Sequence, residues 1–232
     1  MLEELRAAVC AANRRLPALG LAPLNFGNAS GIDRASSVVA IKPSGVDYAS
    51  LRPEDIVLVD LQGKVVAGGL KPSTDTPTHV SLYRSFPSIG GIVHTHSPAA
   101  TSFAQAARPI PALGTTHADY FNGPVPVTRE LTDEEIARNY EEATGTVLKE
   151  ALNGADPLSL PAALAVHHGP FIWGGTVDQA VENACALEFV ADCALRTLAL
   201  APAMREMPVV LRQKHFLRKH GPSAYYGQKR AH

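Results

Sequence analysis

Apolar positions at helical spacing open the chain. Leu5, Val9, Ala12 and Leu16 recur every three or four residues, so residues 3–16 are predicted to form an amphipathic helix. Short runs rich in β-branched residues follow, and these are typical of strands. The whole pattern predicts strands at 38–41, 55–60, 64–67, 91–95, near 124–127 and at 164–166, and helices at 76–85, 98–106, 132–151, 176–200 and 209–217.

Capping and turn signals set several of these boundaries. Thr76-Pro77 predicts a helix start, with the threonine as N-cap and the proline as the first helical residue. Thr132–Glu135 and Thr176–Gln179 each have the spacing of a capping box and open two longer helices. Gln62-Gly63 lies between two β-rich runs and indicates a hairpin turn.

The order of these elements predicts the fold class. Strands and helices alternate without a strict strand–helix–strand rhythm, and hairpin signals occur between strands. We therefore expect one α/β domain with a central, mostly antiparallel or mixed β-sheet flanked by helices on both faces. A chain of 232 residues is long enough to bury one sizeable core in such a domain.

Composition excludes several classes of protein. The formal net charge of -1 lacks the basic surplus of a typical nucleic-acid binder, and no apolar run is long enough to span a bilayer. The first residues are charged and lack the apolar core of a signal peptide, so we expect a cytoplasmic protein. The three cysteines, Cys10, Cys185 and Cys193, form no ligand pattern. Any metal site must then be built from histidine and carboxylate side chains.

The strongest local motif is the pair His94 and His96 at the end of a predicted apolar strand. Side chains at positions i and i+2 of a strand point to the same face, so the two imidazoles project together. Neutral imidazole suits Zn, Cu, Fe and Ni. The pair therefore suggests a metal site. Two histidines that merely end a strand explain the motif equally well when it is taken alone.

A second motif, His167-His168-Gly169-Pro170, follows another short apolar strand. It offers a third imidazole, and only one of its two histidines is expected to face the metal because neighbours in a strand point opposite ways. Three protein ligands with an open fourth position are the arrangement of a catalytic zinc. A histidine in the core or at a cap is the alternative interpretation.

Two further segments combine cations, hydroxyls and small residues. Lys71–Thr76 precedes a predicted helix, where hydroxyls and backbone N–H groups suit a phosphate, and its Asp75 is placed to reach a metal or to act as a base. Ordinary helix capping is the alternative. Lys42–Gly45 and Gly27-Asn28 are polar turns of the same kind. The phosphate-loop and dinucleotide-binding motifs are absent, so we expect no nucleotide site.

Together these motifs resemble the class II sugar-phosphate aldolase/epimerase family, from the first helix to Gln228. The segments that carry the resemblance are residues 27–28, 41–48, 71–79, 86–96, 114–121, 168–171, 217–221 and 225–228. Thr115–Tyr120 and the Tyr-Tyr-Gly-Gln tail resemble the epimerases of the family more than its aldolases. The resemblance implies a single domain over residues 1–228, with residues 229–232 as a short C-terminal tail.

The resemblance also implies a role for each site residue. His94, His96 and His168 are the expected imidazole ligands, with Asp75 on or near the metal. The residues expected to bind substrate, mostly at its phosphate end, are Gly27, Asn28, Lys42, Ser44, Gly45, Ser73, Thr74 and Thr115. Asp119 and Tyr226 form the implied acid/base pair. His215 and Arg218 are expected to reach the site of a neighbouring subunit, because the family forms homotetramers of C4 symmetry with active sites at the subunit interfaces.

The activity that the resemblance implies is metal-assisted epimerisation of a small phosphorylated sugar, L-ribulose 5-phosphate to D-xylulose 5-phosphate, by cleavage and re-formation of C3–C4. The expected metal is Zn²⁺, with Mn²⁺ or Co²⁺ as alternatives. A class II aldolase acting on a compound such as L-fuculose 1-phosphate is the main rival. A structural zinc domain is disfavoured because no cysteine is placed to serve as a ligand.

The sequence departs from the family pattern at two points. Val166-His167 stands where the epimerases have His-Ser before the ligand at His168, so His167 is not expected to be a ligand. Ser73-Thr74 replaces a Ser-Ser pair and keeps its hydroxyl.

Overall fold

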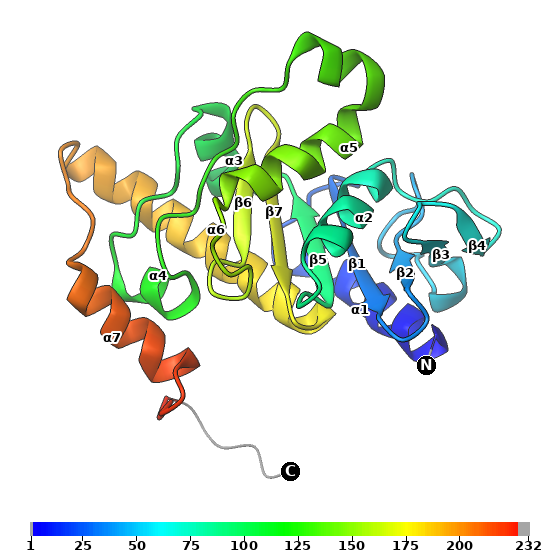
Figure 1. Ribbon diagram of the computed structural model, residues 1–232, viewed down its shortest axis with the longest axis horizontal. Helices are drawn as coiled ribbons and strands as arrows, with labels where there is room; N and C mark the ends of the chain where they lie inside the picture. The colour runs from blue at the N-terminus through cyan, green and yellow to red at the C-terminus, as the bar shows by residue number, and fades with distance from the viewer. Residues whose placement is uncertain (1, 227–232) are drawn as a thin grey trace.

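The computed structural model describes residues 2–226 and has a central antiparallel β-sheet (Figure 1). In this part of the chain the sheet has seven strands, in the order β4-β3-β2-β1-β5-β7-β6, and every neighbouring pair is antiparallel. The strands are β1 (Gly27–Asp33), β2 (Val38–Ile41), β3 (Val57–Asp60), β4 (Val65–Ala67), β5 (Gly91–Thr95), β6 (Ala162–Ala165) and β7 (Gly169–Gly174). The expected tail at 229–232 lies outside the described residues.

Helices cover both faces of the sheet, as the sequence predicts. One face carries α1 (Leu2–Ala18), α3 (Pro98–Gln105) and α6 (Val177–Leu200), and the other carries α2 (Thr76–Ser85) and α5 (Asp133–Ala151). The helices α4 (Thr115–Tyr120) and α7 (Val209–His220) pack on each other at one end of the molecule. A 3₁₀ turn, η1 (Pro53–Asp55), leads into β3. No helix within residues 2–226 combines the length and the apolar character needed to cross a bilayer.

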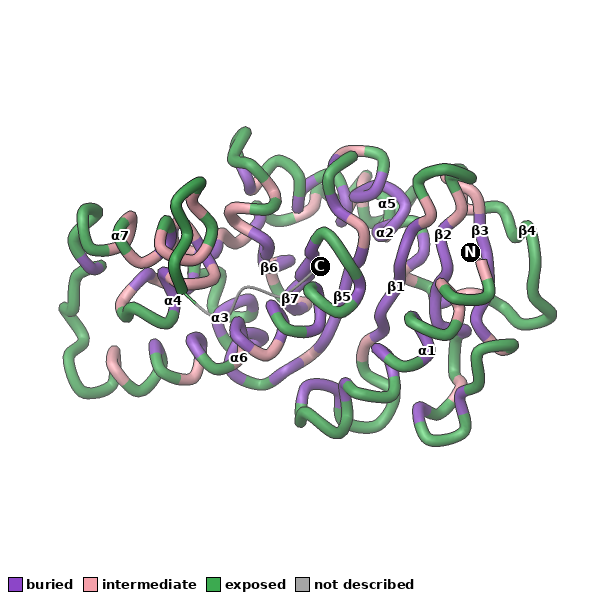
Figure 2. Tube along the Cα trace, turned by 90° about the horizontal axis from the view of Figure 1, so that it is seen from below, coloured by how far each residue is buried: buried purple, intermediate pink, exposed green. Residues whose placement is uncertain are grey.

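Each face of the sheet has its own hydrophobic core, and β5 contributes to both. Val93 packs in the core under α1, α3 and α6, whereas Ile92 packs in the core under α2 and α5. Because side chains alternate along a strand, His94 points to the same face as Ile92. Buried positions run through the central strands, while α7 is largely exposed (Figure 2). The strand that carries the predicted ligand is thus buried along its whole length.

Several predicted boundaries hold and others are wrong. The Thr132–Glu135 capping box is confirmed, as is the hairpin turn at Gly63. At α2 the N-cap residue is Asp75 instead of Thr76, and its carboxylate makes no capping bond because it accepts from Asn28. At α6, Thr176 caps the helix as predicted, but the reciprocal bond runs from the N–H of Gly175 to Gln179.

Three elements of the structure are absent from the predicted set. Gly27-Asn28 is the start of the central strand β1 instead of a free turn, and β7 and α4 were not predicted. The sequence of β1, Gly-Asn-Ala-Ser-Gly-Ile-Asp, is poor in β-branched residues, so burial between β2 and β5 holds it in the sheet. Near 124–127 the chain forms isolated bridges at Val125 and Val127 where a strand was expected.

A glycine controls how closely α6 approaches β5. A Cβ atom at Gly91 would lie 2.4 Å from the Cα atom of Val177 and 2.7 Å from the carbonyl oxygen of Thr176. Both are backbone atoms, so no side chain can move aside. The absence of a side chain at this position is what lets the start of α6 lie against the strand.

We therefore expect Gly91→Ala to lower the free energy of unfolding by about 3 kcal/mol, because overpacking against a backbone is relieved only by shifting the helix. Gly69→Ala is the matched control, since a Cβ atom there meets nothing within 4 Å. Denaturant unfolding of both variants measures the difference. Equal stability of the two variants would contradict the close approach of α6.

Candidate metal centre

Three imidazoles converge at the end of the sheet where the β6–β7 turn lies. His94 lies in β5, His96 follows the end of β5, and His168 lies in the turn before β7. One ligand atom from each lies within 4.8 Å of the others. The ring centroids of His168 are 4.7 Å from His94 and 5.0 Å from His96. The structure therefore brings together all three histidines that the sequence analysis singles out as ligands.

Hydrogen bonding fixes the orientation of His94. Its Nδ1 donates to the carbonyl oxygen of Pro170 at 3.0 Å, and its ring stacks on Phe171 with centroids 4.1 Å apart. A carbonyl oxygen only accepts, so Nδ1 holds the proton and Nε2 presents a lone pair. That Nε2 lies 3.1 Å from Nε2 of His96. Converging neutral imidazole nitrogens of this kind are a donor set for a divalent cation such as zinc.

The electrostatics keep these histidines neutral. The pKa of His94 is lowered to about 3, mainly by burial; Asp75 opposes this shift, and the neighbouring histidines add to it. Burial also lowers the pKa of His96 and of His168. Near neutral pH all three rings are uncharged, which is the form that binds a metal.

Asp75 lies beside the three histidines, and hydrogen bonding fixes its carboxylate. Its Oδ2 accepts from the amide of Asn28 at 2.6 Å, and the same amide donates to the hydroxyl of Ser73 at 3.1 Å. Burial raises the pKa of Asp75, but its electrostatic interactions with His94 and His79 and the Asn28 hydrogen bond outweigh that effect, so the pKa is lowered overall. Asn28 pairs directly with His94 across β1 and β5. The carboxylate is therefore ionised and lies on the metal-facing side of the sheet.

The two predicted phosphate turns lie side by side. The N–H of Ser73 donates to the carbonyl of Lys42, and the N–H of Ser44 donates to that of Lys71, both at 3.0 Å. Lys42 is buried. Among residues 2–226 its Nζ donates a hydrogen bond only to the carbonyl of Pro43, and it lies 4.9 Å from the ring centroid of Tyr48. Burial lowers the pKa of Lys42.

The remaining predicted phosphate-site residues surround this pair of turns. Ser44, Gly45 and Thr74 are exposed, while Asn28 and Ser73 are buried. Gly27 starts β1 with φ 121°, where a Cβ atom would meet the carbonyl oxygen of His94 at 2.4 Å. Its own carbonyl accepts from the hydroxyl of Tyr48 at 2.6 Å. The oxygen Oδ1 of Asn28 is buried and has no hydrogen-bond partner within the described part of the chain. The turns therefore offer donors and a buried cation, and the hydrogen bonds of Asn28 with Ser73 and Asp75 connect them to the carboxylate beside the histidines.

Asp119 belongs to a second polar cluster, between α4 and α7. It accepts from Arg218 at 2.8 and 3.1 Å and lies 3.2 Å from Nδ1 of His215. Burial raises its pKa, but the bonds from Arg218 and His215 outweigh that effect and lower it. The ring centroid of Tyr226 lies 4.7 Å from the guanidinium of Arg218. Thr115 is exposed at the first residue of α4.

These two clusters do not meet within one chain. Among residues 2–226, no hydrogen bond or ion pair connects the cluster at Asp119 with the three histidines. In Figure 1, α4 and α7 lie at the lower left, whereas the β6–β7 turn is at the top of the sheet. The structure therefore separates the expected acid/base pair from the expected metal ligands of the same subunit.

His167 points away from the three histidines. It lies in the turn with φ 59°, and its Nε2 is 3.3 Å from a carboxylate oxygen of Glu130. Alternation along a strand predicts that the two adjacent histidines diverge. They do diverge, but because the chain turns there.

Sequence reasoning missed a buried partner of this site, His79. It lies one helical turn after Asp75, and its Nδ1 is 2.7 Å from the hydroxyl of Ser30, which is 2.9 Å from the hydroxyl of Tyr83. Burial lowers the pKa of His79 to about 4. The spacing of four residues from Asp75 on a helix was the available signal.

Comparison with known proteins gives the same family by two routes. Residues 7–195 match the model of the Class II Aldolase and Adducin N-terminal domain. The chain is 50% identical over 228 residues to proteins named L-ribulose-5-phosphate 4-epimerase UlaF from Salmonella paratyphi C and Salmonella choleraesuis, covering 98% of this chain and 100% of each relative.

Solved structures share the fold. A protein named L-fuculose 1-phosphate aldolase superposes with a TM-score of 0.80 at 23% identity, covering 91% of this chain and 94% of that one. The L-fuculose-1-phosphate aldolase from Thermus thermophilus gives 0.70 at 26% identity, covering 88% and 100%. With its group of three histidines and these matches, the chain belongs to the class II aldolase family, whose members are metal-dependent enzymes.

Proposed function

We propose that the protein is an epimerase that interconverts L-ribulose 5-phosphate and D-xylulose 5-phosphate. The observation that carries the proposal is the convergence of His94, His96 and His168 beside an ionised Asp75 and the buried cation of Lys42. The full-length similarity to two proteins with that name supports the choice of reaction.

We propose Zn²⁺ as the metal, with Mn²⁺ and Co²⁺ as ions that the same donor set accepts. The histidines would be its ligands, and Asp75 would lie on or next to it. A divalent cation there supplies Lewis-acid polarisation of a carbonyl group and stabilises the negative charge that develops when a carbon–carbon bond breaks. Three protein ligands leave the coordination position that a substrate needs.

The chemistry of the substrate explains why bond cleavage is needed. The C4 proton of a ketopentose 5-phosphate is not α to the C2 carbonyl, so its direct removal is difficult. Breaking C3–C4 instead gives a two-carbon aldehyde that carries the phosphate, and rotation of that aldehyde before recombination inverts C4. The site must then hold the phosphate while the aldehyde turns. Lys42, Ser73 and the turn at Ser44-Gly45 are proposed to do so by charge-assisted hydrogen bonds.

Proton transfer is needed on both faces of the aldehyde. We propose that Asp119 and Tyr226 perform it in the active site of a neighbouring subunit of a C4 homotetramer, where His215 and Arg218 would also contact substrate. The separation of Asp119 from the histidines in one chain supports this arrangement. Exposed apolar side chains near the end of α6 and on α7 support a subunit interface there, namely Leu195, Leu200, Met204, Val209, Val210 and Leu217.

An aldolase of the same family is the second candidate, favoured by the superposition on L-fuculose 1-phosphate aldolase. The two activities share the cleavage step, and they differ in whether the aldehyde is retained. Product analysis separates them.

We expect purified protein loaded with Zn²⁺ or Mn²⁺ to convert L-ribulose 5-phosphate to D-xylulose 5-phosphate without releasing fragments, as followed by NMR. Protein stripped of metal is the control and should be inactive. Release of dihydroxyacetone and glycolaldehyde phosphate without D-xylulose 5-phosphate would show an aldolase. L-fuculose 1-phosphate is the comparison substrate.

Mixing two inactive variants tests the shared active site. We expect His94→Asn and Asp119→Asn proteins each to lack activity, and a refolded equal mixture to recover roughly a quarter of wild-type activity, because one site in four then combines intact halves from two subunits. A mixture that stays inactive, although the refolded variants form mixed tetramers, would contradict the proposal. Each variant refolded alone is the control.

A further inference from the structure

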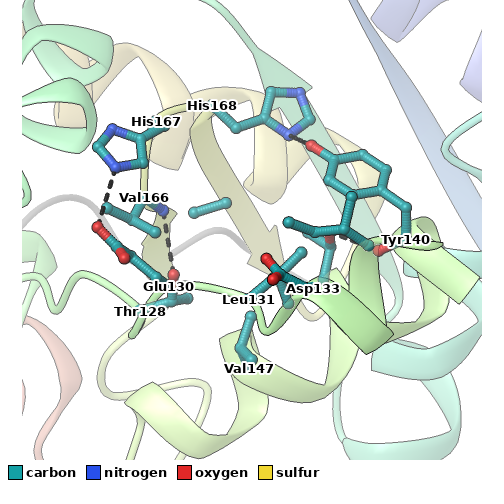
Figure 3. Close-up of a pocket in the computed structure, with 12 residues that line it drawn as sticks. Thr128, Glu130, Leu131, Asp133, Tyr140, Val147, Val166, His167 and His168 are labelled. Atoms are coloured by element: carbon teal, nitrogen blue, oxygen red, sulfur yellow. Dashed lines mark hydrogen bonds and ion pairs between the residues drawn. The ribbon is translucent and has the colours of Figure 1, made fainter.

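His168 lines a cavity of about 350 Å³ that neither His94 nor His96 lines. Figure 3 shows this cavity between the β6–β7 turn and α5. Tyr140 enters it from α5, and its hydroxyl lies 3.3 Å from Nδ1 of His168. The two rings lie 6.3 Å apart, centroid to centroid, with planes inclined at 28°. A tyrosine that the proposed reaction does not use thus contacts a proposed metal ligand from behind.

A break in α5 places Tyr140 there. Asn139, the residue before it, has non-helical dihedral angles of φ -148° and ψ 57°. Arg129 bonds both Glu135 and Glu150, at 2.8 and 2.9 Å, although a straight helix would hold those residues about 22 Å apart. The first turns of α5 therefore fold back over the rest (Figure 1). Side chains from both parts of α5 line the cavity, including Ile136 before the break and Tyr140 and Val147 after it.

The second nitrogen of a metal-ligating histidine usually donates to a protein oxygen, which fixes the tautomer and the rotation of the ring. His94 has such a partner in the carbonyl of Pro170, which its Nδ1 contacts at 3.0 Å. His168 has one in Tyr140, also through Nδ1. Figure 3 shows the other ring nitrogen of His168 pointing away from Tyr140. The two histidines are therefore held in the same manner although their partners differ.

We infer that Tyr140 is the positioning residue of His168. Its hydroxyl oxygen accepts a hydrogen bond from the Nδ1–H group of His168 and holds the ring so that Nε2 faces His94 and His96. The inference rests on the proposed metal centre. His168 needs such a restraint because it lies in a turn and not in a strand, and its side chain is only partly buried. His94, in contrast, is enclosed by β1, β7 and the ring of Phe171.

The expected size of the effect follows from the cavity. Loss of an outer partner of a metal ligand commonly costs 10–100-fold in metal affinity. Without the hydroxyl, Nδ1 of His168 would face a cavity roomy enough for water, so a water molecule replaces part of the bond. We therefore expect Tyr140→Phe to weaken Zn²⁺ binding about tenfold, the lower end of that range.

Competition with a chromogenic chelator measures Zn²⁺ affinity in the full-length protein without reference to activity. Ile136→Ala is the matched control, because Ile136 lines the same cavity and its aliphatic side chain cannot accept a hydrogen bond from His168. We expect this control to bind Zn²⁺ like wild type, and metal-free Tyr140→Phe to unfold at the wild-type temperature. Wild-type affinity in Tyr140→Phe would overturn the inference, as would an equal loss in Ile136→Ala.

A double variant shows whether the hydroxyl acts through His168. In a His168→Asn background, Tyr140→Phe should cause no further loss of affinity, because the group it positions is gone. A further tenfold loss there would mean that Tyr140 acts on the fold and would refute the positioning role. If the wild-type protein does not bind Zn²⁺, or if its Zn²⁺ binding survives the His94→Asn substitution, the proposed metal centre itself fails. If the wild-type protein binds Zn²⁺ through His94 but Tyr140→Phe does not weaken that binding, the metal centre stands and the inference about Tyr140 fails.

Discussion

The hydrogen bond from Nδ1 of His94 to the carbonyl oxygen of Pro170 ties together the two parts of the chain that carry the imidazoles. It spans β5 and β7, the strands that bring His96 and His168 to the same end of the sheet. It also sets the tautomer of His94, so that the lone pair on Nε2 faces the other rings. Asn28, on the opposite side of His94 in β1, extends the same row of the sheet and holds Asp75. The metal-facing geometry thus depends on strand register, and a one-residue slip in β5 would turn His94 into the opposite core.

Charge and burial divide the proposed catalytic work between two clusters. Around the three histidines, burial keeps the imidazoles neutral, while the carboxylate of Asp75 stays ionised. Around Asp119, a bidentate guanidinium and His215 organise a second carboxylate at the exposed end of the molecule. Under the proposed function, each cluster supplies part of one active site, and the proposed assembly of subunits would unite them without changing either one.

The sequence predicts the convergence of the three histidines better than it predicts the strands around them. The shared direction of the His94 and His96 side chains follows from alternation in a strand. The antiparallel sheet between two layers of helices follows from the order of the elements. The strand β1 was missed because Gly27–Asp33 has little β-propensity and is held by its neighbours. The kink at Asn139 and the contact of Tyr140 with His168 depend on the tertiary bonds of Arg129, which no local pattern indicates. The distance between Asp119 and the histidines likewise depends on the path of the chain and not on spacing.

The most direct test of the account is the location of the metal. Crystals of the protein grown with Zn²⁺ should give one strong anomalous peak above the zinc absorption edge, about 2.1 Å from a nitrogen of each of His94, His96 and His168. The peak should vanish in data collected below that edge. A peak elsewhere, with the three histidines free of metal at a saturating Zn²⁺ concentration, would contradict the central claim.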